Sequence, residues 1–131
     1  MPVLYKLQQS PLPMMLMETA MMLMDDQEQF LLMETDKGTW RLPTEIVLEG
    51  ERLEDAVVRY LHNHRTFIST PPELIDMTMN AKSLKKVTAL YCVHIQSNPT
   101  TLKAFSFNAL PKTIERDTLD YLASYVAKRT V

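Results

Sequence analysis

Acidic residues crowd into one short stretch of the chain, at Glu45, Glu49, Glu51, Glu54 and Asp55. Carboxylate oxygens are the ligands that Mg²⁺ prefers, so this stretch could hold a hard cation that neutralises phosphate groups. Acidic residues are equally at home in solvated loops and in the first turn of a helix, where the helix dipole attracts negative charge. We therefore keep Glu45, Glu49 and Glu51 as weak catalytic candidates, and we predict no metal site.

Tyr60 and His64 stand four residues apart, a spacing that brings two side chains into contact along one face of a helix. Histidine can bind transition metals or transfer protons near neutral pH. His62, however, is two residues from His64 and would point to a different side of the same helix. We expect Tyr60 and His64 to pack together, and we keep both as candidates for contact with a ligand.

Aromatic and basic side chains could stack on bases and pair with phosphates. The aromatic candidates are Trp40, Tyr91, Phe105 and Phe107. The basic candidates are Lys82, Lys85 and Lys86. Base stacking needs an exposed ring, whereas rings in apolar runs are more often packed in a core, and lysines in short groups more often lie in solvated turns. Of these residues we keep Trp40 and Tyr91 as ligand-binding candidates, together with Arg59.

Hydrophobic periodicity places the elements that must position these residues. Two β-like runs, 18–24 and 29–34, are joined by a polar turn and predict a hairpin. Short extended pieces at 40–42 and 46–48 follow around Pro43. Apolar residues then recur at the spacing of one helical face from Leu53 to His64, which predicts a helix there.

The second half of the chain alternates in the manner of strands before it ends in a helix. We predict strands at 74–79 and 86–96, and we expect 101–107 to pair back onto the second of these as a hairpin partner. An amphipathic helix should cover 117–128. Its expected inward residues are Leu119, Leu122, Tyr125 and Val126. This order of elements predicts an α/β (α+β) fold with a mixed sheet.

Composition limits the classes of function. The 131 residues suit one domain, which we place at 17–131 after an N-terminal arm at 1–16 with a short strand at Val3–Leu7. A net charge of −2 gives no general attraction to nucleic acid or to anionic membranes. We expect a cytoplasmic protein, because the start of the chain does not resemble a signal peptide and no apolar run approaches the roughly 18 residues of a membrane span. The single cysteine, Cys92, is expected in the core.

Methionine is the one unusual component, with ten in the chain. Methionine fills irregular gaps in cores, and it also makes soft, adaptable contact surfaces for partners. The groups at 14–17 and 21–24 therefore leave open a third role, as a structural subunit of a larger assembly that contains RNA.

The stretch from Gly38 to Phe67 resembles the Nudix family. Members carry a tryptophan, then Leu-Pro-Gly-Gly, a Gly-Glu pair and a helix with Arg-Glu-x-x-Glu-Glu. The matching residues are Trp40, Leu42, Pro43, Gly50, Glu51, Leu53, Glu54, Ala56, Arg59, Leu61 and Phe67. The resemblance implies a Nudix-like α/β/α sandwich with a mixed sheet, one Nudix-box helix and a C-terminal helix.

The departures fall where the family's chemistry is located. Tyr60, Asn63 and His64 replace the three glutamates of the helix, and Thr44 and Glu45 replace the two glycines. The last glycine of the box is Thr66. Family members hydrolyse nucleoside diphosphates linked to another group, using Mg²⁺ held by those glutamates. A phenol, an amide and an imidazole are poor substitutes, because Mg²⁺ is usually anchored by carboxylates.

We therefore predict a catalytically inactive, Nudix-like domain that works by binding. Its target would be a protein partner, a second copy of itself or a nucleotide-like ligand, with no cofactor; RNA is a weaker candidate and no membrane is involved. The alternative is a hydrolase with a shifted Mg²⁺ site formed by Glu45, Glu49 and Glu51, and only this alternative needs Mg²⁺.

Overall fold

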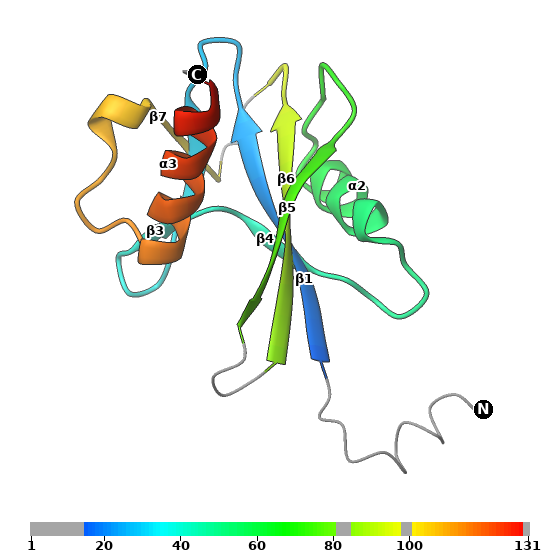
Figure 1. Ribbon diagram of the computed structural model, residues 1–131. Coiled ribbons are helices and arrows are strands. Elements are labelled where there is room, and N and C mark those ends of the chain that lie inside the picture. The colour runs from blue at the N-terminus through cyan, green and yellow to red at the C-terminus, as the bar shows by residue number, and fades with distance from the viewer. Residues whose placement is uncertain (1–14, 81–84, 98–100, 130–131) are drawn as a thin grey trace.

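The computed structural model describes residues 15–80, 85–97 and 101–129 (Figure 1). The expected strand at Val3–Leu7 and most of the expected arm lie outside these ranges. The first described strand, β1, begins at Met15, two residues before the expected start of the domain. Within the described ranges, no helix is both long and apolar enough to cross a membrane.

One mixed sheet forms the centre of the molecule, with the main strand order β3-β2-β1-β6-β5. The strands are β1 (Met15–Met24), β2 (Phe30–Glu34), β3 (Trp40–Arg41), β4 (Thr44–Ile46), β5 (Glu73–Asn80), β6 (Lys85–His94) and β7 (Lys103–Phe105). β1 and β6 run parallel in register over their whole length, from Met15 opposite Lys85 to Met24 opposite His94. β5 pairs antiparallel with the other side of β6.

The predicted hairpin of β1 and β2 is confirmed. The Asp25 carboxylate shapes its turn by accepting hydrogen bonds from the backbone N–H groups of Gln27 and Gln29. The predicted pairing of 101–107 with 86–96 is wrong. β7 pairs with β2 instead, with Phe30 opposite Phe105, because β1 and β5 already occupy both sides of β6. The extended piece after Pro43 is also shifted: β4 covers Thr44–Ile46 and pairs with β1.

The predicted internal helix is α2 (Leu53–Asn63). Its first turn is capped by Asp55, whose carboxylate accepts a hydrogen bond from the Arg52 amide at 2.9 Å. Its end is set by Arg65, which takes a left-handed φ of 51° and turns the chain back. The buried face, which includes Val57 and Leu61, packs on the odd-numbered side chains of β1, such as Met21.

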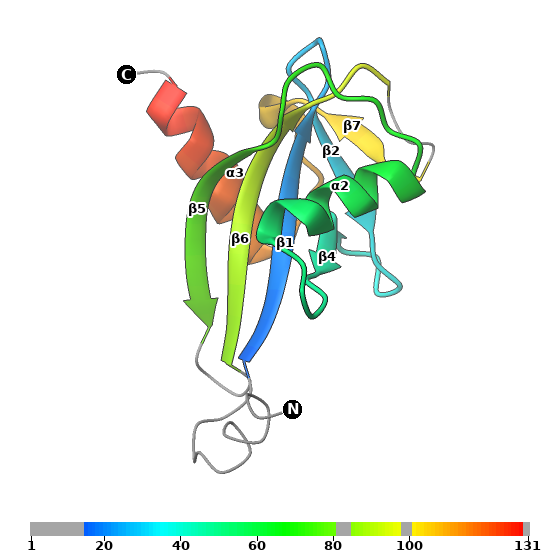
Figure 2. The ribbon, with the colours of Figure 1, turned by 90° about the vertical axis from the view of Figure 1, so that its right-hand side faces the viewer.

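The C-terminal helix is α3 (Arg116–Arg129), which follows the short 3-10 helix η1 (Phe107–Ala109). It covers the opposite face of the sheet from α2, as Figure 2 shows. Leu122 is fully buried there, and Tyr125 and Val126 pack around it. Leu119, which was predicted to point inward, is only half-buried, and its neighbour Thr118 is buried instead. The expected α/β/α sandwich is confirmed.

Three methionines of β1 belong to the core. Met21, Met22 and Met24 are at most 2% exposed, and they alternate between the two faces of the sheet. The expectation that this group could dock onto a neighbouring subunit is therefore wrong for 21–24, because no surface of these side chains is free. Burial of such side chains contributes about 1.5–3 kcal/mol each to folding.

Candidate functional site

Arg59 organises the acidic loop before α2. Its guanidinium donates to the Glu45 carboxylate at 2.6 Å and to the Glu51 carboxylate at 3.0 Å. A further guanidinium nitrogen donates to the backbone oxygen of Ile46 at 2.7 Å. The Arg59 guanidinium therefore occupies the space in which a metal cation would have to bind these two glutamates.

The pKa values of the charged groups follow from these contacts. The hydrogen bond from Arg59 lowers the pKa of Glu51, helped by the amide of Leu48, which donates to the same carboxylate. The hydrogen bonds to Glu51 and Glu45 raise the pKa of Arg59. Because this arrangement keeps both partners ionised at neutral pH, Glu51 is not available as a proton acceptor without losing its partner.

Tyr60 and His64 form a stacked pair on the next part of α2. Their ring centroids are 4.0 Å apart with an interplanar angle of 25°, and His64 Nδ1 lies 2.9 Å from the backbone oxygen of Tyr60. Tyr60 is 6% exposed. Burial raises the pKa of its phenol to about 12, so the ring carries no negative charge at neutral pH. The predicted contact between these two residues is confirmed.

The remaining candidates on this side do not gather around one point. Asn63, His62 and Glu49 are exposed, and Asp55 is held by the capping contact with Arg52. In the part of the chain that the structure describes, no group of three or more His, Cys, Asp or Glu side chains could hold a metal ion. Glu45, Glu49 and Glu51 thus do not form a carboxylate cluster, and the residues present do not fit a Mg²⁺ ion.

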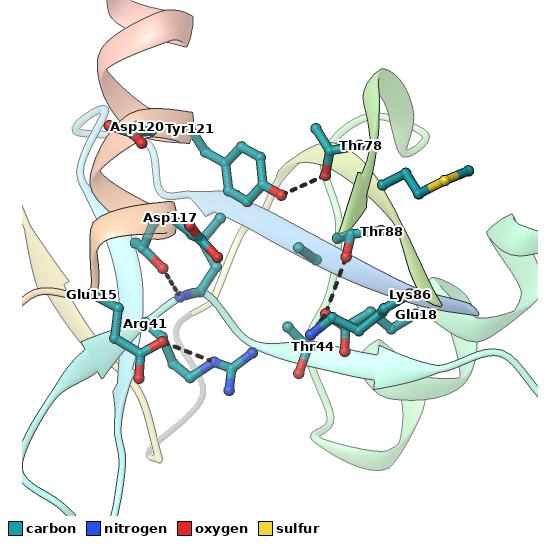
Figure 3. A pocket seen from close by; sticks show the side chains of 14 residues that line it. Glu18, Arg41, Thr44, Thr78, Lys86, Thr88, Glu115, Asp117, Asp120 and Tyr121 are labelled. Atoms are coloured by element: carbon teal, nitrogen blue, oxygen red, sulfur yellow. Dashed lines mark hydrogen bonds and ion pairs between the residues drawn. The ribbon is translucent and has the colours of Figure 1, made fainter. Parts of the chain in front are cut away.

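A polar cavity of about 530 Å³ opens on the other face of the sheet. Its floor is formed by β1, β5 and β6, and its wall by the start of α3 (Figure 3). The polar lining residues are Glu18, Arg41, Thr44, Thr78, Lys86, Thr88, Glu115, Asp117, Thr118, Asp120 and Tyr121. The volume falls within the range of about 300–1,000 Å³ that small-molecule sites usually have.

Both basic side chains in the cavity are already paired with acids. Lys86 lies 3.3 Å from the Glu18 carboxylate, which also accepts from the Thr88 hydroxyl at 3.3 Å. Arg41 lies 4.0 Å from Glu115, and Glu115 accepts from Thr39 at 2.9 Å. Figure 3 shows these two pairs on separate sides of the cavity.

Hydrogen bonds also fix the wall of the cavity to its floor. The hydroxyls of Thr78 on β5 and Tyr121 on α3 lie 2.9 Å apart. The Leu42 amide donates to the buried Thr118 hydroxyl at 3.2 Å, which anchors the first turn of α3. The wall is therefore built by contacts between segments that are distant in the sequence.

Two of the predicted ligand-contacting residues belong to packed regions. Trp40 is half-buried and meets Phe105 edge to face at a centroid distance of 5.0 Å. Tyr91 is 5% exposed and lies in the core cluster under α2. Neither lines the cavity. Of the lysine group, Lys86 lines it, whereas Lys82 and the Lys85 side chain lie outside the described part of the structure.

Sequence reasoning missed the cavity residues Glu18, Asp117 and Thr118. One signal was available for Glu18, because it interrupts an apolar strand at a position that shares a face with Ala20 and Met22. A lone charge on a face that otherwise packs in the core is the kind of position where a ligand site opens.

Comparison with known proteins settles the fold. The chain superposes on the crystal structure of a MutT Nudix hydrolase from Burkholderia pseudomallei with a TM-score of 0.70 and 19% identity, covering 84% of this chain and 97% of that one. For the MutT protein from Methanosarcina mazei the TM-score is 0.70 and the identity 16%, with 93% of this chain and 100% of that one covered. The chain has a Nudix-like fold.

A UDP-X diphosphatase shares the same Nudix-like architecture with a TM-score of 0.62 and 16% identity, over 98% of this chain and 71% of that one. No protein-family model matches the sequence, and no curated protein matches it either. At these identities the similarity establishes the fold alone.

Proposed function

We propose that this Nudix-like domain works by binding and does not hydrolyse nucleoside diphosphate-linked compounds. The observation that carries the proposal is that the side chains on the α2 face already have partners within the chain. Arg59 holds Glu45 and Glu51, and the Tyr60–His64 stack takes the place of the helix glutamates. The word hydrolase in the names of the similar solved structures describes those proteins. The helix glutamates that the Nudix resemblance implies for such chemistry are replaced in this chain by Tyr60, Asn63 and His64.

Electrostatics supports the same conclusion. A Mg²⁺ ion bound between Glu45 and Glu51 would have to displace the Arg59 guanidinium, or lie close to it as a second cation. Each loss of a charge-assisted hydrogen bond weakens the loop, and two cations at short range repel each other. A metal ion at the shifted site could therefore bind only after existing contacts of Arg59 are broken.

The cavity on the α3 side is the proposed ligand site. It is separate from α2, is lined by groups with hydrogen-bonding capacity, and is bounded by fixed contacts such as Thr78 with Tyr121. Preorganised pockets with a few well-placed polar groups are typical of small-molecule sites.

A turnover assay tests the proposal. The full chain is incubated with Mg²⁺ or Mn²⁺ and a panel of a nucleoside diphosphate sugar and a dinucleoside polyphosphate, with an active Nudix hydrolase in parallel. We expect no release of phosphate or monophosphate from this chain. Metal-dependent release that Glu51→Gln abolishes would establish the shifted-site hydrolase in its place. Release that Glu51→Gln leaves unchanged would overturn both readings of the α2 face.

A protein partner, including a second copy, is a further candidate because β5 is an edge strand with exposed apolar side chains. Met77 is 47% exposed and Met79 is 62% exposed, and both stand on the same face of the strand. Unpaired edges with apolar side chains favour strand addition from another chain. Light scattering over a concentration series should show self-association that Met79→Lys reduces. A strictly monomeric protein would exclude the homodimer.

A further inference from the structure

The outer edge of β5 has a short regular part that begins after a bulge. The register of β5 against β6 shifts between Leu74 and Asp76 and is then regular as far as Asn80. β5 ends the main strand order of the described sheet, and Figure 2 shows its lower half with no described helix or strand on the outer side. Another strand can therefore pair with this edge along 76–80 without meeting the bulge.

The backbone of Met77 points away from the sheet. Its N–H donates to the neighbouring Asp76 carboxylate at 2.8 Å and not to β6. Because successive residues of an antiparallel strand direct their N–H and C=O groups to alternate sides, Thr78 turns toward β6 and Met79 turns outward again. Met77 and Met79 thus present the backbone groups to which another strand can bond.

The side chains of the same two methionines are exposed on one face of the sheet. Met77 stands opposite Ala89, a core residue beneath α2, so both methionines lie on the α2 side. With exposed fractions of 47% for Met77 and 62% for Met79, they leave apolar surface in water beside the unpaired backbone. A partner strand that covers this surface gains from its burial as well as from the backbone hydrogen bonds.

A second copy of β5 meets both requirements when a two-fold axis passes through Thr78. Antiparallel pairing about this axis sets Met77 opposite Met79 of the second copy, so their outward backbone groups exchange hydrogen bonds and their side chains meet. Asp76 then stands opposite position 80, which is an uncharged asparagine. Moving the axis to Met77 brings the bulge into the pairing, and moving it to Asp76 sets two carboxylates opposite each other, which is destabilising.

We propose that two copies of this chain associate through β5 in this register, and that Asp76 limits the affinity by holding the Met77 N–H. The carboxylate has to release this N–H before the second copy can accept it, so association breaks an existing hydrogen bond in each copy. Bulges and charged residues are common means of restricting pairing at sheet edges. The inference rests on the binding role proposed above and narrows the protein partner to a second copy.

Disulfide trapping tests the register. Thr78→Cys and Met77→Cys are oxidised separately in a glutathione buffer, with the native Cys92 buried in both. In the proposed register the two copies of position 78 are directly opposite, with Cα atoms about 4.5 Å apart, within reach of a disulfide. The two copies of position 77 are offset by two residues and lie more than about 7 Å apart. We expect a covalent dimer of Thr78→Cys and much less of Met77→Cys, although Met77 is the more exposed side chain. The opposite preference, or no covalent dimer of either, would overturn the register.

Sedimentation equilibrium tests the role of Asp76. Asp76→Ala should strengthen self-association about ten-fold relative to the parent, because neither copy then gives up a hydrogen bond. The matched control, Glu73→Ala, removes the same charge from the same strand and leaves the Met77 N–H with its partner, so it should change the affinity less than about two-fold. Equal gains from the two changes would overturn the role of Asp76.

A parent chain that stays monomeric at millimolar concentration would overturn the pairing itself. The turnover assay separates this inference from the proposed function. Turnover overturns the proposed function whatever the state of association, whereas a monomeric chain without turnover overturns only the β5 pairing.

Discussion

The two faces of the sheet differ in how their charged groups are satisfied. On the α2 side, Arg59 holds Glu45 and Glu51, and the neutral Tyr60–His64 stack closes the rest of the face. On the α3 side a cavity is open, and the carboxylates of Asp117 and Asp120 face solvent. Polar groups that already have partners stabilise the fold, whereas polar groups without partners around a cavity remain free to bind a ligand.

This difference teaches where to look for function in a fold whose usual catalytic residues are replaced. The position of the family motif is the natural first choice, but here it is the more closed of the two regions. Breaking the packed stack of Tyr60 and His64 on the α2 side should therefore cost the most stability, whereas breaking a single contact at the wall of the α3-side cavity should cost less.

The largest expected effect is on the α2 side. Tyr60→Ala removes a ring that is 6% exposed and stacked on His64, and it should lower the free energy of unfolding by about 3 kcal/mol or more. Urea denaturation measures this change. Val58→Ala is the matched control on the same helix, because Val58 is 50% exposed, and it should change stability by no more than about 0.5 kcal/mol. Equal effects of the two changes would contradict the packing role of Tyr60.

A smaller effect is expected for the wall of the cavity. Thr78→Val and Tyr121→Phe each remove one side of the 2.9 Å hydroxyl contact, and each should lower the free energy of unfolding by about 1 kcal/mol. The double variant should cost clearly less than the sum, since the second change has no contact left to break. Additive losses in a double-mutant cycle would show that this contact does not hold α3 to β5.

The smallest effect at neutral pH is expected for Arg59→Ala, because its ion pairs are partly exposed and screened by solvent. Its signature is a pH dependence. Arg59 lowers the pKa of Glu51 below its ordinary value of 4.5, so this contribution to stability is present above that pH and is lost as the pH falls through the folded-state pKa. The stability difference between parent and Arg59→Ala should thus shrink below about pH 4.5, as measured by urea midpoints. A difference that does not change with pH would contradict the assigned role of the ion pair.

How much of the fold and of the candidate site the sequence predicts depends on how far apart in the chain the contacting residues lie. The α2 helix and the Tyr60–His64 contact follow from a four-residue spacing, and both were predicted. The partner of β7 was predicted wrongly, because a strand pairs with whichever edge is free, and local alternation does not say that β1 and β5 take both sides of β6. Strand register and pairing are set by tertiary context more than by propensity.

The cavity was missed for the same reason. Its ion pair between Glu18 and Lys86 joins positions that meet only because β1 and β6 run parallel, and its wall depends on Thr78 reaching Tyr121. Arg59 was kept as a ligand candidate from the family motif, but its partner Glu45 stands where the family has glycine. No family pattern could therefore supply that contact, and only the folded loop brings the two side chains together.

The most direct test of the central claim is a titration of the isotope-labelled chain with Mn²⁺, followed by the paramagnetic broadening of amide signals. Because Arg59 already fills the space between Glu45 and Glu51, and Tyr60 and His64 close the helix face, we expect no localised broadening at 44–51 or 59–64. Selective broadening of those two segments, reversed by excess Mg²⁺, would show that a metal site exists there and would contradict the account.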